Sequence, residues 1–161
     1  MTSMAVPIGA KPHKLDTAGR LKLRDDERPF FGESVVVSAG FDNCISFFDL
    51  QRWEQFVADF DKLAAQDPEA HDLRRLLLST AEQCEIDAQG RLRIPEFLLS
   101  WAELGGGKLD AMLIRVGEGR WECWEENRYR DFLRQRAQEL KQVATTFWST
   151  GASLREGPAG G

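Results

Sequence analysis

The sequence predicts an α+β fold built from two related halves in tandem, with helices at the periphery. Three observations lead to this prediction. The motif Asp-x-x-Gly-Arg occurs twice, at residues 16–20 and 87–91, an offset of 71 residues (87 − 16). Each copy is followed by alternating apolar and basic residues, which is the period of a β-strand. Each is followed further along by a segment with helical periodicity, so we interpret the chain as an internal repeat.

The first half opens with a predicted β-hairpin at residues 13–23, "HKLDTAGRLKL". Asp16 starts the turn, because its carboxylate can accept a hydrogen bond from the backbone two residues on. Gly19 can take a positive φ and close a short loop that contains a bulge. Beyond the glycine, strand alternation separates apolar and basic side chains. The apolar face holds Leu21 and Leu23, and the basic face holds Arg20, Lys22 and Arg24.

The rest of the first half reads as two strands followed by two helices. Residues 34–39 and 43–49 are rich in β-branched and aromatic residues, which favours strands. Trp53, Phe56, Phe60 and Leu63 then recur at spacings of three and four, as on one face of a helix. Pro68 interrupts that helix, and residues 69–81 are expected to form a second one.

The second half repeats this order. Asp87 and Gly90 form the turn, Leu92 and Ile94 lie opposite Arg91 and Arg93, and Pro95 ends the strand because it has no N–H to donate. Strands are expected at 110–117 and 120–125, and a long amphipathic helix from Tyr129 to about Trp148. The extra residues of this half lie between the two motif matches, and we expect them at the glycines of 105–107.

The expected organisation follows from these elements. It comprises a disordered arm at 1–10, a first half at 11–67, a connecting helix at 68–81, a second half at 82–133, a helical continuation at 134–150 and a disordered tail at 151–161. No apolar run approaches the roughly 20 residues that cross a bilayer, and the N-terminus lacks the apolar core of a secretory signal. We therefore expect a cytoplasmic protein.

Charge and cysteine content narrow the classes of function. The net charge is −5, yet residues 1–24 carry five basic side chains against one acidic side chain, a local balance of +4 (5 − 1). An acidic chain can therefore still present a basic face. The cysteines, Cys44, Cys84 and Cys123, are odd in number and form no CxxC pair, so neither a disulfide framework nor a zinc site is indicated. We expect no cofactor.

Three segments, "LDTAGRLKL", "RRLLLSTAEQCEIDAQGRLRIP" and "RWECWEENRY", together resemble the MraZ family, bacterial transcriptional regulators of the division and cell-wall gene cluster. The resemblance runs from about residue 13 to residue 133. It implies two AbrB-like units of the double-psi, swapped-hairpin β-barrel type, related by a pseudo-twofold axis. It also implies chains assembled in a ring on double-stranded DNA, at short direct repeats upstream of their own operon, usually as a repressor associated with the nucleoid.

The resemblance assigns DNA contact to Arg20 and Arg91, with Asp16, Gly19, Asp87 and Gly90 building the turns. Lys14, Lys22, Arg24 and Arg93 are supporting charges, and each could equally be solvated surface. A β-ribbon with basic side chains on one face can enter the major groove or lie along phosphates. The family normally has a proline at the position of Arg24.

Alternatives remain open at this point. The drifted first half could leave an oligomeric scaffold or protein-interaction module that no longer binds DNA. Asp16 and Asp87 could be a catalytic pair, although turn formation explains both, and no pocket with convergent polar groups is predicted for an enzyme. His13, next to Lys14, could touch phosphate. The aromatic residues Phe47, Phe48, Trp53, Trp121 and Trp124 could stack on bases, although their spacing fits a core better.

Overall fold

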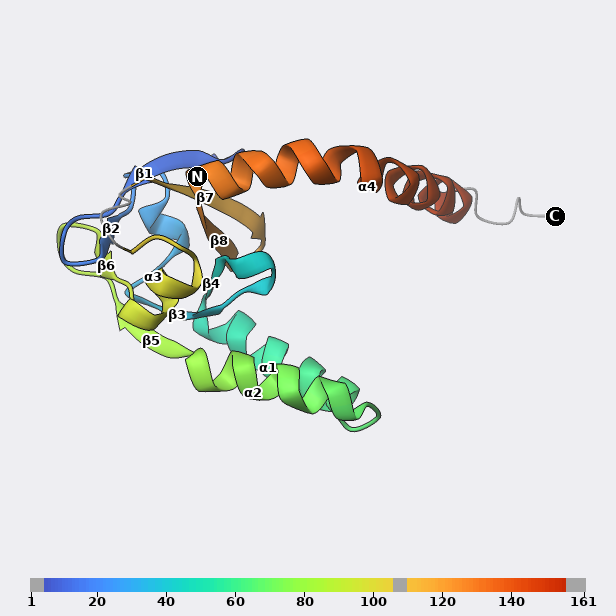
Figure 1. Ribbon diagram of the computed structural model, residues 1–161, viewed down its shortest axis with the longest axis horizontal. Coiled ribbons are helices and arrows are strands. Elements are labelled where there is room, and N and C mark those ends of the chain that lie inside the picture. The colour runs from blue at the N-terminus through green and yellow to red at the C-terminus, as the bar shows by residue number, and fades with distance from the viewer. Residues whose placement is uncertain (1–4, 106–109, 156–161) are drawn as a thin grey trace. The chain divides into compact units, whose positions relative to one another are not determined.

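The computed structural model describes residues 5–105 and 110–155, with side chains described as far as residue 150 (Figure 1). It divides into two compact units, Met1–Glu126 and Asn127–Gly161. The first unit holds every strand of the described residues. The second holds helix α4 (Glu126–Arg155) apart from its first residue.

The two halves of the sequence contribute matching elements to the first unit. The first half forms β1 (Lys11–Lys14), β2 (Arg20–Lys22), the 3-10 turn η1 (Arg28–Phe30), β3 (Ser34–Ala39), the 3-10 turn η2 (Phe41–Asn43), β4 (Ile45–Phe48), α1 (Leu50–Ala64) and α2 (Pro68–Thr80). The second half forms β5 (Glu82–Glu85), β6 (Arg91–Arg93), α3 (Glu96–Trp101), β7 (Asp110–Gly117) and β8 (Arg120–Glu125). The fold is therefore α+β, as the sequence predicts.

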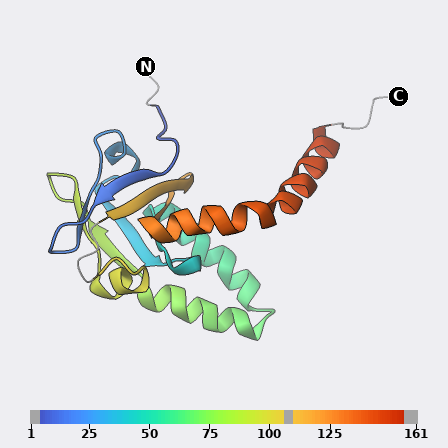
Figure 2. The same cartoon turned by 45° about the horizontal axis from the view of Figure 1, so that its top comes forward.

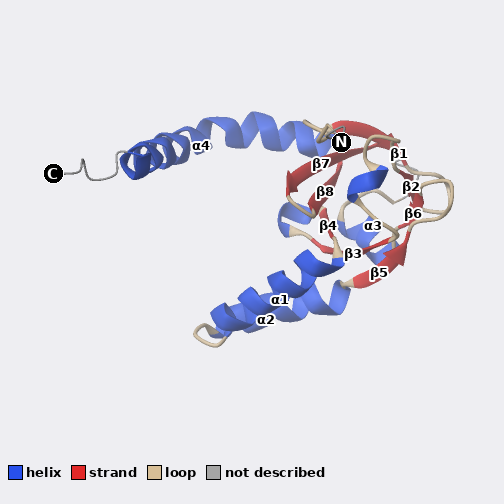
Figure 3. Cartoon of the chain, turned by 180° about the vertical axis from the view of Figure 1, so that it is seen from behind, coloured by secondary structure: helices blue, strands red, loops and turns tan. Residues whose placement is uncertain are grey.

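The strands form two antiparallel sheets, seen as red arrows in Figure 3. The larger sheet has the order β1-β7-β8-β4-β3-β5, and the smaller pairs β2 with β6. The two sides of the larger sheet correspond strand by strand: β1 to β5, β7 to β3 and β8 to β4. The order therefore reads the same from either edge, as a twofold relation between the halves requires.

The pairing register follows the same relation. At the centre of β4–β8, Ser46 lies opposite Glu122, at an offset of 76 residues (122 − 46). At the centre of β2–β6, Leu21 lies opposite Leu92, at an offset of 71 residues (92 − 21). Each central pair joins equivalent positions, so a pseudo-twofold axis passes through both. The difference between the offsets locates the insertion between β6 and β7, where α3 lies and where the sequence predicts only irregular structure.

The predicted hairpins differ from the structure in their pairing. β1 pairs with β7 and β5 with β3, while β2 pairs with β6, so both strands of each hairpin have their main partners in the other half. Within a hairpin, only the single bridges Leu15↔Leu21 and Ile86↔Leu92 connect the two strands. Alternation identifies a strand and its buried face but does not identify its partner, so the sequence pattern alone could not reveal this exchange.

The core lies where the two halves meet. Leu21, Leu92 and Leu113 have no exposed surface, and Phe31 packs on Trp121 with ring centroids 4.7 Å apart. Phe47, Phe48, Trp121 and Trp124 are each at most 5% exposed. These four rings cannot stack on bases from a bound nucleic acid, and the interpretation of them as core residues is confirmed.

Helices α1 and α2 lie side by side in both Figure 1 and Figure 2. The side chain of Asp49 accepts the amide of Arg52 at 2.7 Å and caps α1, while that of Asp67 accepts the amide of Glu69 at 2.9 Å and caps α2. Pro68 is the first residue of α2, a position that needs no amide donor. The predicted break at Pro68 is confirmed for this reason.

Helix α4 is longer than the sequence predicts. It begins at Glu126 rather than near Tyr129 and continues to Arg155, so residues 151–155, expected to be disordered, are helical. Each added residue extends the helix by one backbone hydrogen bond, which requires no apolar side chain. At the other end, residues 5–10 contain neither helix nor strand, while 1–4 and 156–161 lie outside the described residues. None of the described helices has both the length and the apolarity to cross a membrane.

Candidate nucleic-acid interface

The two motif loops have the same internal hydrogen bonds. Oδ1 of Asp16 accepts the amides of Ala18 at 3.0 Å and Arg20 at 2.9 Å. Oδ1 of Asp87 accepts the amides of Gln89 and Arg91, both at 2.9 Å. Both loops project from the same end of the first unit (Figures 1 and 2).

A glycine completes each loop. Gly19 has φ of 73° and Gly90 has φ of 76°, in the left-handed region that glycine adopts without strain. The spacing of aspartate and glycine therefore builds a compact loop whose shape depends mainly on local contacts.

Each loop also fixes the orientation of its arginine. Nε of Arg20 donates to Oδ2 of Asp16 at 2.6 Å, and Nε of Arg91 donates to Oδ2 of Asp87 at 2.8 Å. The pKa of both aspartates lies below its ordinary value, primarily because each carboxylate accepts the backbone amide of the arginine. The carboxylates therefore stay ionised and hold the guanidinium groups through Nε alone. About a third of each arginine side chain is exposed, so the terminal Nη groups are available to a ligand.

The ribbon formed by β2 and β6 concentrates basic side chains on its outer face. Arg20 lies opposite Arg93, and Lys22 lies opposite Arg91. Leu21, between Arg20 and Lys22, is completely buried, so the neighbouring basic side chains point the other way. Like charges directly opposite each other destabilise a strand pair. In each pair the motif arginine is balanced by the aspartate of its loop, whereas Lys22 and Arg93 form no ion pair among the described residues and could bind a polyanion.

Two supporting charges lie beyond the ribbon. Lys14 is exposed on β1, where its Cα partner is Asp110. Arg24 lies two residues beyond Lys22, where β2 ends, and Leu23 between them is buried and donates its amide to the carbonyl oxygen of Gly90 at 2.9 Å. The amide of Arg24 donates to Glu27 at 2.9 Å, and its Nε lies 3.5 Å from Oδ1 of Asp26. The alternation of buried and exposed side chains thus reaches Arg24, and its place on the same face as Arg20 and Lys22 stays a prediction.

His13 is not available to phosphate. Its side chain is buried, with Nδ1 at 2.8 Å from the carbonyl oxygen of Lys11 and Nε2 at 2.7 Å from Oε2 of Glu27. Glu27 is itself completely buried. The pair joins β1 to the turn that follows β2, which is a structural role rather than a ligand contact.

The sequence pattern missed Arg28, which lies over the second loop. Its Nη2 donates to the carbonyl oxygen of Ala88 at 3.2 Å. A Cβ atom placed on Gly90 would lie 2.9 Å from Cδ and Nε of Arg28, so the side chain packs against the glycine. The contact joins residues 60 positions apart, and the acidic neighbours in "RDDERPFF" gave no signal for it.

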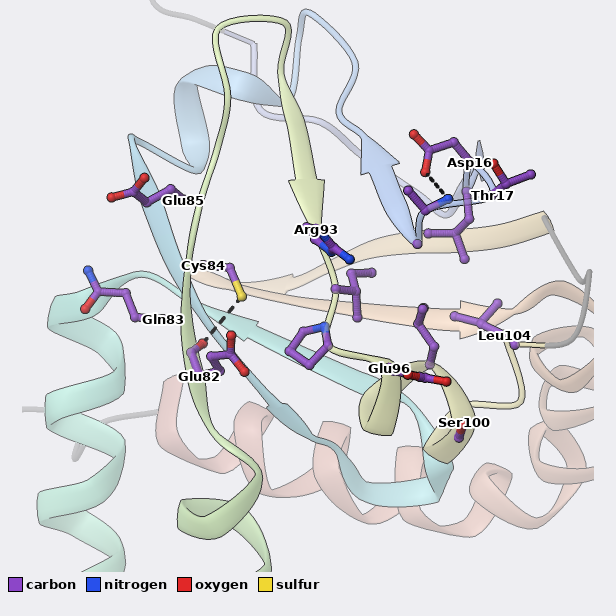
Figure 4. A pocket seen from close by; sticks show the side chains of 17 residues that line it. Asp16, Thr17, Glu82, Gln83, Cys84, Glu85, Arg93, Glu96, Ser100 and Leu104 are labelled. Carbon is purple, nitrogen blue, oxygen red and sulfur yellow. Dashed lines mark hydrogen bonds between the residues drawn. The ribbon is translucent and has the colours of Figure 1, made fainter.

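A groove of about 870 Å³ lies beside the first loop, between that loop, β5 and α3 (Figure 4). Its polar lining includes Glu82, Glu85 and Glu96, with Arg93 as the basic side chain. With Asp16, which also lines the groove, four carboxylates face this side of the first loop and repel phosphate. Cys84 also lines the groove, and burial raises the pKa of its thiol to about 11, so the thiol stays protonated near neutral pH. Within the residues described, no cluster of three or more His, Cys, Asp or Glu side chains could hold a metal ion.

Comparison with known proteins gives one consistent family. The family model described as "MraZ protein" matches the chain twice, at residues 8–76 and 77–148, once in each half. The Transcriptional regulator MraZ of Roseiflexus sp. (strain RS-1) is 33% identical over 126 residues, 78% of this chain and 85% of the relative. That of Lactiplantibacillus plantarum is 31% identical over 138 residues, 85% of this chain and 94% of the relative.

A third relative, the Transcriptional regulator MraZ of Desulfitobacterium hafniense (strain Y51), is 30% identical over 144 residues, 89% of this chain and 98% of the relative. The match therefore extends over nearly the whole of each relative. The duplicated family match agrees with the twofold strand order and the paired register of the fold. On this evidence the chain belongs to the MraZ family, a family of transcriptional regulators and not of enzymes.

Proposed function

We propose that this protein regulates transcription by binding double-stranded DNA through the β2–β6 ribbon and its two loops. Like-charged residues directly opposite each other carry the proposal: Arg20 with Arg93, and Lys22 with Arg91. Each pair combines a motif arginine, which is balanced by the aspartate of its loop, with a second cation that forms no ion pair among the described residues, and the leucines beneath the pairs are buried. Arg20 and Arg91, each held through Nε by an aspartate, present their Nη groups to DNA.

The proposal extends to architecture and mechanism. We infer that the exchanged strands form AbrB-like swapped-hairpin units of the double-psi type. We further infer that copies of the chain assemble into a homo-oligomeric ring associated with the nucleoid, because one chain offers a small footprint. Linked sites gain effective concentration, so a ring spanning direct repeats upstream of its own division and cell-wall operon would bind far more tightly than one chain. Occupied repeats would exclude polymerase, which makes repression the expected outcome.

Fluorescence anisotropy tests the proposal with labelled DNA from upstream of the gene, scrambled DNA as competitor and several salt concentrations. We expect binding that resists the competitor and weakens steeply with salt, with log affinity falling by about 0.9 per phosphate contact for each tenfold rise in salt. Arg91→Ala and Arg20→Ala should each weaken binding. Arg75→Ala is the matched control, because Arg75 is exposed on α2 and pairs only with Asp72 among the described residues. Equal affinity for scrambled DNA would refute sequence-specific regulation.

A second candidate function is an oligomeric scaffold without DNA contact. The favouring observation lies toward the C-terminal end of α4, where Val143 is 60% exposed and Phe147 and Trp148 are each 67% exposed. Exposed apolar side chains of this size are typical of protein–protein contacts. Light scattering that reports an oligomer, combined with anisotropy that reports no salt-dependent DNA binding, would favour the scaffold over the regulator.

A further inference from the structure

The two motif loops are alike in backbone but are covered by different side chains. Arg28 packs against Gly90 of the second loop, where a Cβ atom would lie 2.9 Å from its Cδ and Nε. Leu99 packs against Gly19 of the first loop, where a Cβ atom would lie 2.8 Å from its Cδ1. Positions 28 and 99 differ by 71 residues, the same offset as the loops themselves (99 − 28). The pseudo-twofold axis therefore exchanges Arg28 and Leu99, and a cation covers one loop where an apolar group covers the other.

The charges around the two loops differ as well, and the second loop again has the more positive surroundings. Glu82, Glu85 and Glu96 line the groove beside the first loop (Figure 4). Subtracting the offset of 71 gives Lys11, Lys14 and Asp25 as their equivalents on the side of the second loop. These three positions carry −3 beside the first loop and +1 beside the second. Asp16 and Arg93, which also line the groove, correspond to Asp87 and Lys22 and balance in both places. Phosphates approaching the second loop meet the more favourable field.

Arg28 also has hydrogen-bonding capacity to spare. A guanidinium carries five N–H donors, and the contact of Arg28 with the carbonyl of Ala88 uses one of them. That contact lies at the exposed surface of the loop and fixes the guanidinium beside residues 88–90. An arginine held in this way loses little side-chain entropy when it binds a phosphate oxygen.

We propose that Arg28 is a further DNA-contacting residue, which binds phosphate beside the second loop, and that this loop carries the larger share of the DNA contact of each chain. The proposal rests on the proposed DNA-binding function. It assigns a ligand, a backbone phosphate, to a residue outside the repeated motif. It also means that the two pseudo-equivalent loops of one chain contribute unequally.

Arg28→Leu is the direct test, because leucine is the residue that covers the equivalent glycine in the first loop. Loss of one phosphate contact should reduce the slope of log affinity against log salt by about 0.9, which weakens binding about eightfold at 0.1 M salt relative to a 1 M reference. Arg28→Lys keeps the charge and should retain most of the slope. Arg75→Leu on α2 serves as the matched control and should leave the slope unchanged. The same anisotropy assay with the upstream DNA measures all of these variants.

The reciprocal change, Leu99→Arg, should raise both affinity and slope by adding the missing cation to the first loop. Thermal unfolding establishes which variants are folded. If Leu99→Arg does not fold, the comparison of Arg28→Leu with Arg28→Lys alone tests the role of Arg28. A wild-type slope in Arg28→Leu would overturn the assignment of Arg28. An Arg20→Ala variant weakened as much as Arg91→Ala would overturn the unequal share. Failure of the wild type to prefer its DNA would instead count against the proposed function itself.

Discussion

Replacing Glu27 by leucine should destabilise the fold strongly, although Glu27 lies in a segment whose sequence resembles an acidic surface turn. Glu27 has no exposed surface. Its Oε2 accepts a hydrogen bond from the amide of Arg24 at 2.9 Å and lies 2.7 Å from Nε2 of His13. His13 is only 5% exposed. The carbonyl of Lys11 can only accept, so Nδ1 of His13 carries a hydrogen toward it, and Nε2 has Glu27 as its sole partner among the described residues.

The loss of unfolding free energy can be estimated from the polar groups that lose their acceptor. Glu27→Leu leaves the amide of Arg24 and Nε2 of His13 without an acceptor, at about 1–3 kcal/mol each. The loss for the two groups together is therefore about 2–6 kcal/mol. The double variant His13→Leu with Glu27→Leu removes both partners and should recover most of the loss. Glu27→Gln keeps an acceptor oxygen and should lose less than Glu27→Leu.

Urea unfolding followed by tryptophan fluorescence measures these differences, since Trp121 is only 4% exposed and reports on the core. All variants must be compared at one protein concentration, because an oligomer is more stable at higher concentration. A loss below about 1 kcal/mol for Glu27→Leu would refute the argument from desolvation. A double variant whose loss equals the sum of the losses of Glu27→Leu and His13→Leu measured alone would show that the two side chains are not energetically coupled.

Three further predictions concern the loops and the axis. Asp87→Asn keeps the oxygen that accepts the loop amides but removes the charge that holds Arg91. Binding to scrambled DNA should therefore rise, and the preference for the upstream DNA should fall. An unchanged preference in anisotropy would mean that Asp87 only forms the turn. Leu92 lies on the pseudo-twofold axis and has no exposed surface, so Leu92→Ala should lower the free energy of unfolding in urea by about 2–5 kcal/mol. A loss below about 1 kcal/mol would contradict the tight packing there. The carboxyl groups of Asp16 and Asp87 should titrate below 3.8 by NMR. Because folding lowers these pKa values, their contribution to stability is present above pH 3.8 and disappears as the pH falls through the lower folded-state values; a titration at or above 3.8 would contradict the observed hydrogen bonds.

Local patterns in the sequence were sufficient to predict most elements of the fold. Alternation around Leu21 and Leu92 identified strands and their buried faces, and Pro68 marked the boundary between two helices. These features depend on residues within a few positions of one another. The exchange of strands between the halves depends on contacts between distant residues, such as Lys11 with Leu113, which no local pattern encodes.

At the candidate site, too, local features could be predicted from the sequence and contacts between side chains could not. Aspartate and glycine at fixed spacing predicted both loops, but not the ion pairs that orient Arg20 and Arg91. His13 looked like a phosphate ligand because its sequence neighbour is Lys14, whereas strand alternation turns it into the interior. Arg28 could have been found by aligning it with Leu99 at the offset of the repeat, once the strand exchange was known.

The exchange of strands between the halves constrains how the chain folds during synthesis. β1 cannot pair until β7 has left the ribosome, and β2 likewise waits for β6. β4 can pair with β3 in the first half, but its other edge waits for β8. The nascent first half therefore exposes unpaired strand edges, which attract chaperones and other chains. A product truncated within the second half has no way to cover these edges. We therefore expect incomplete chains to be more open to proteolysis than chains with both loops in place.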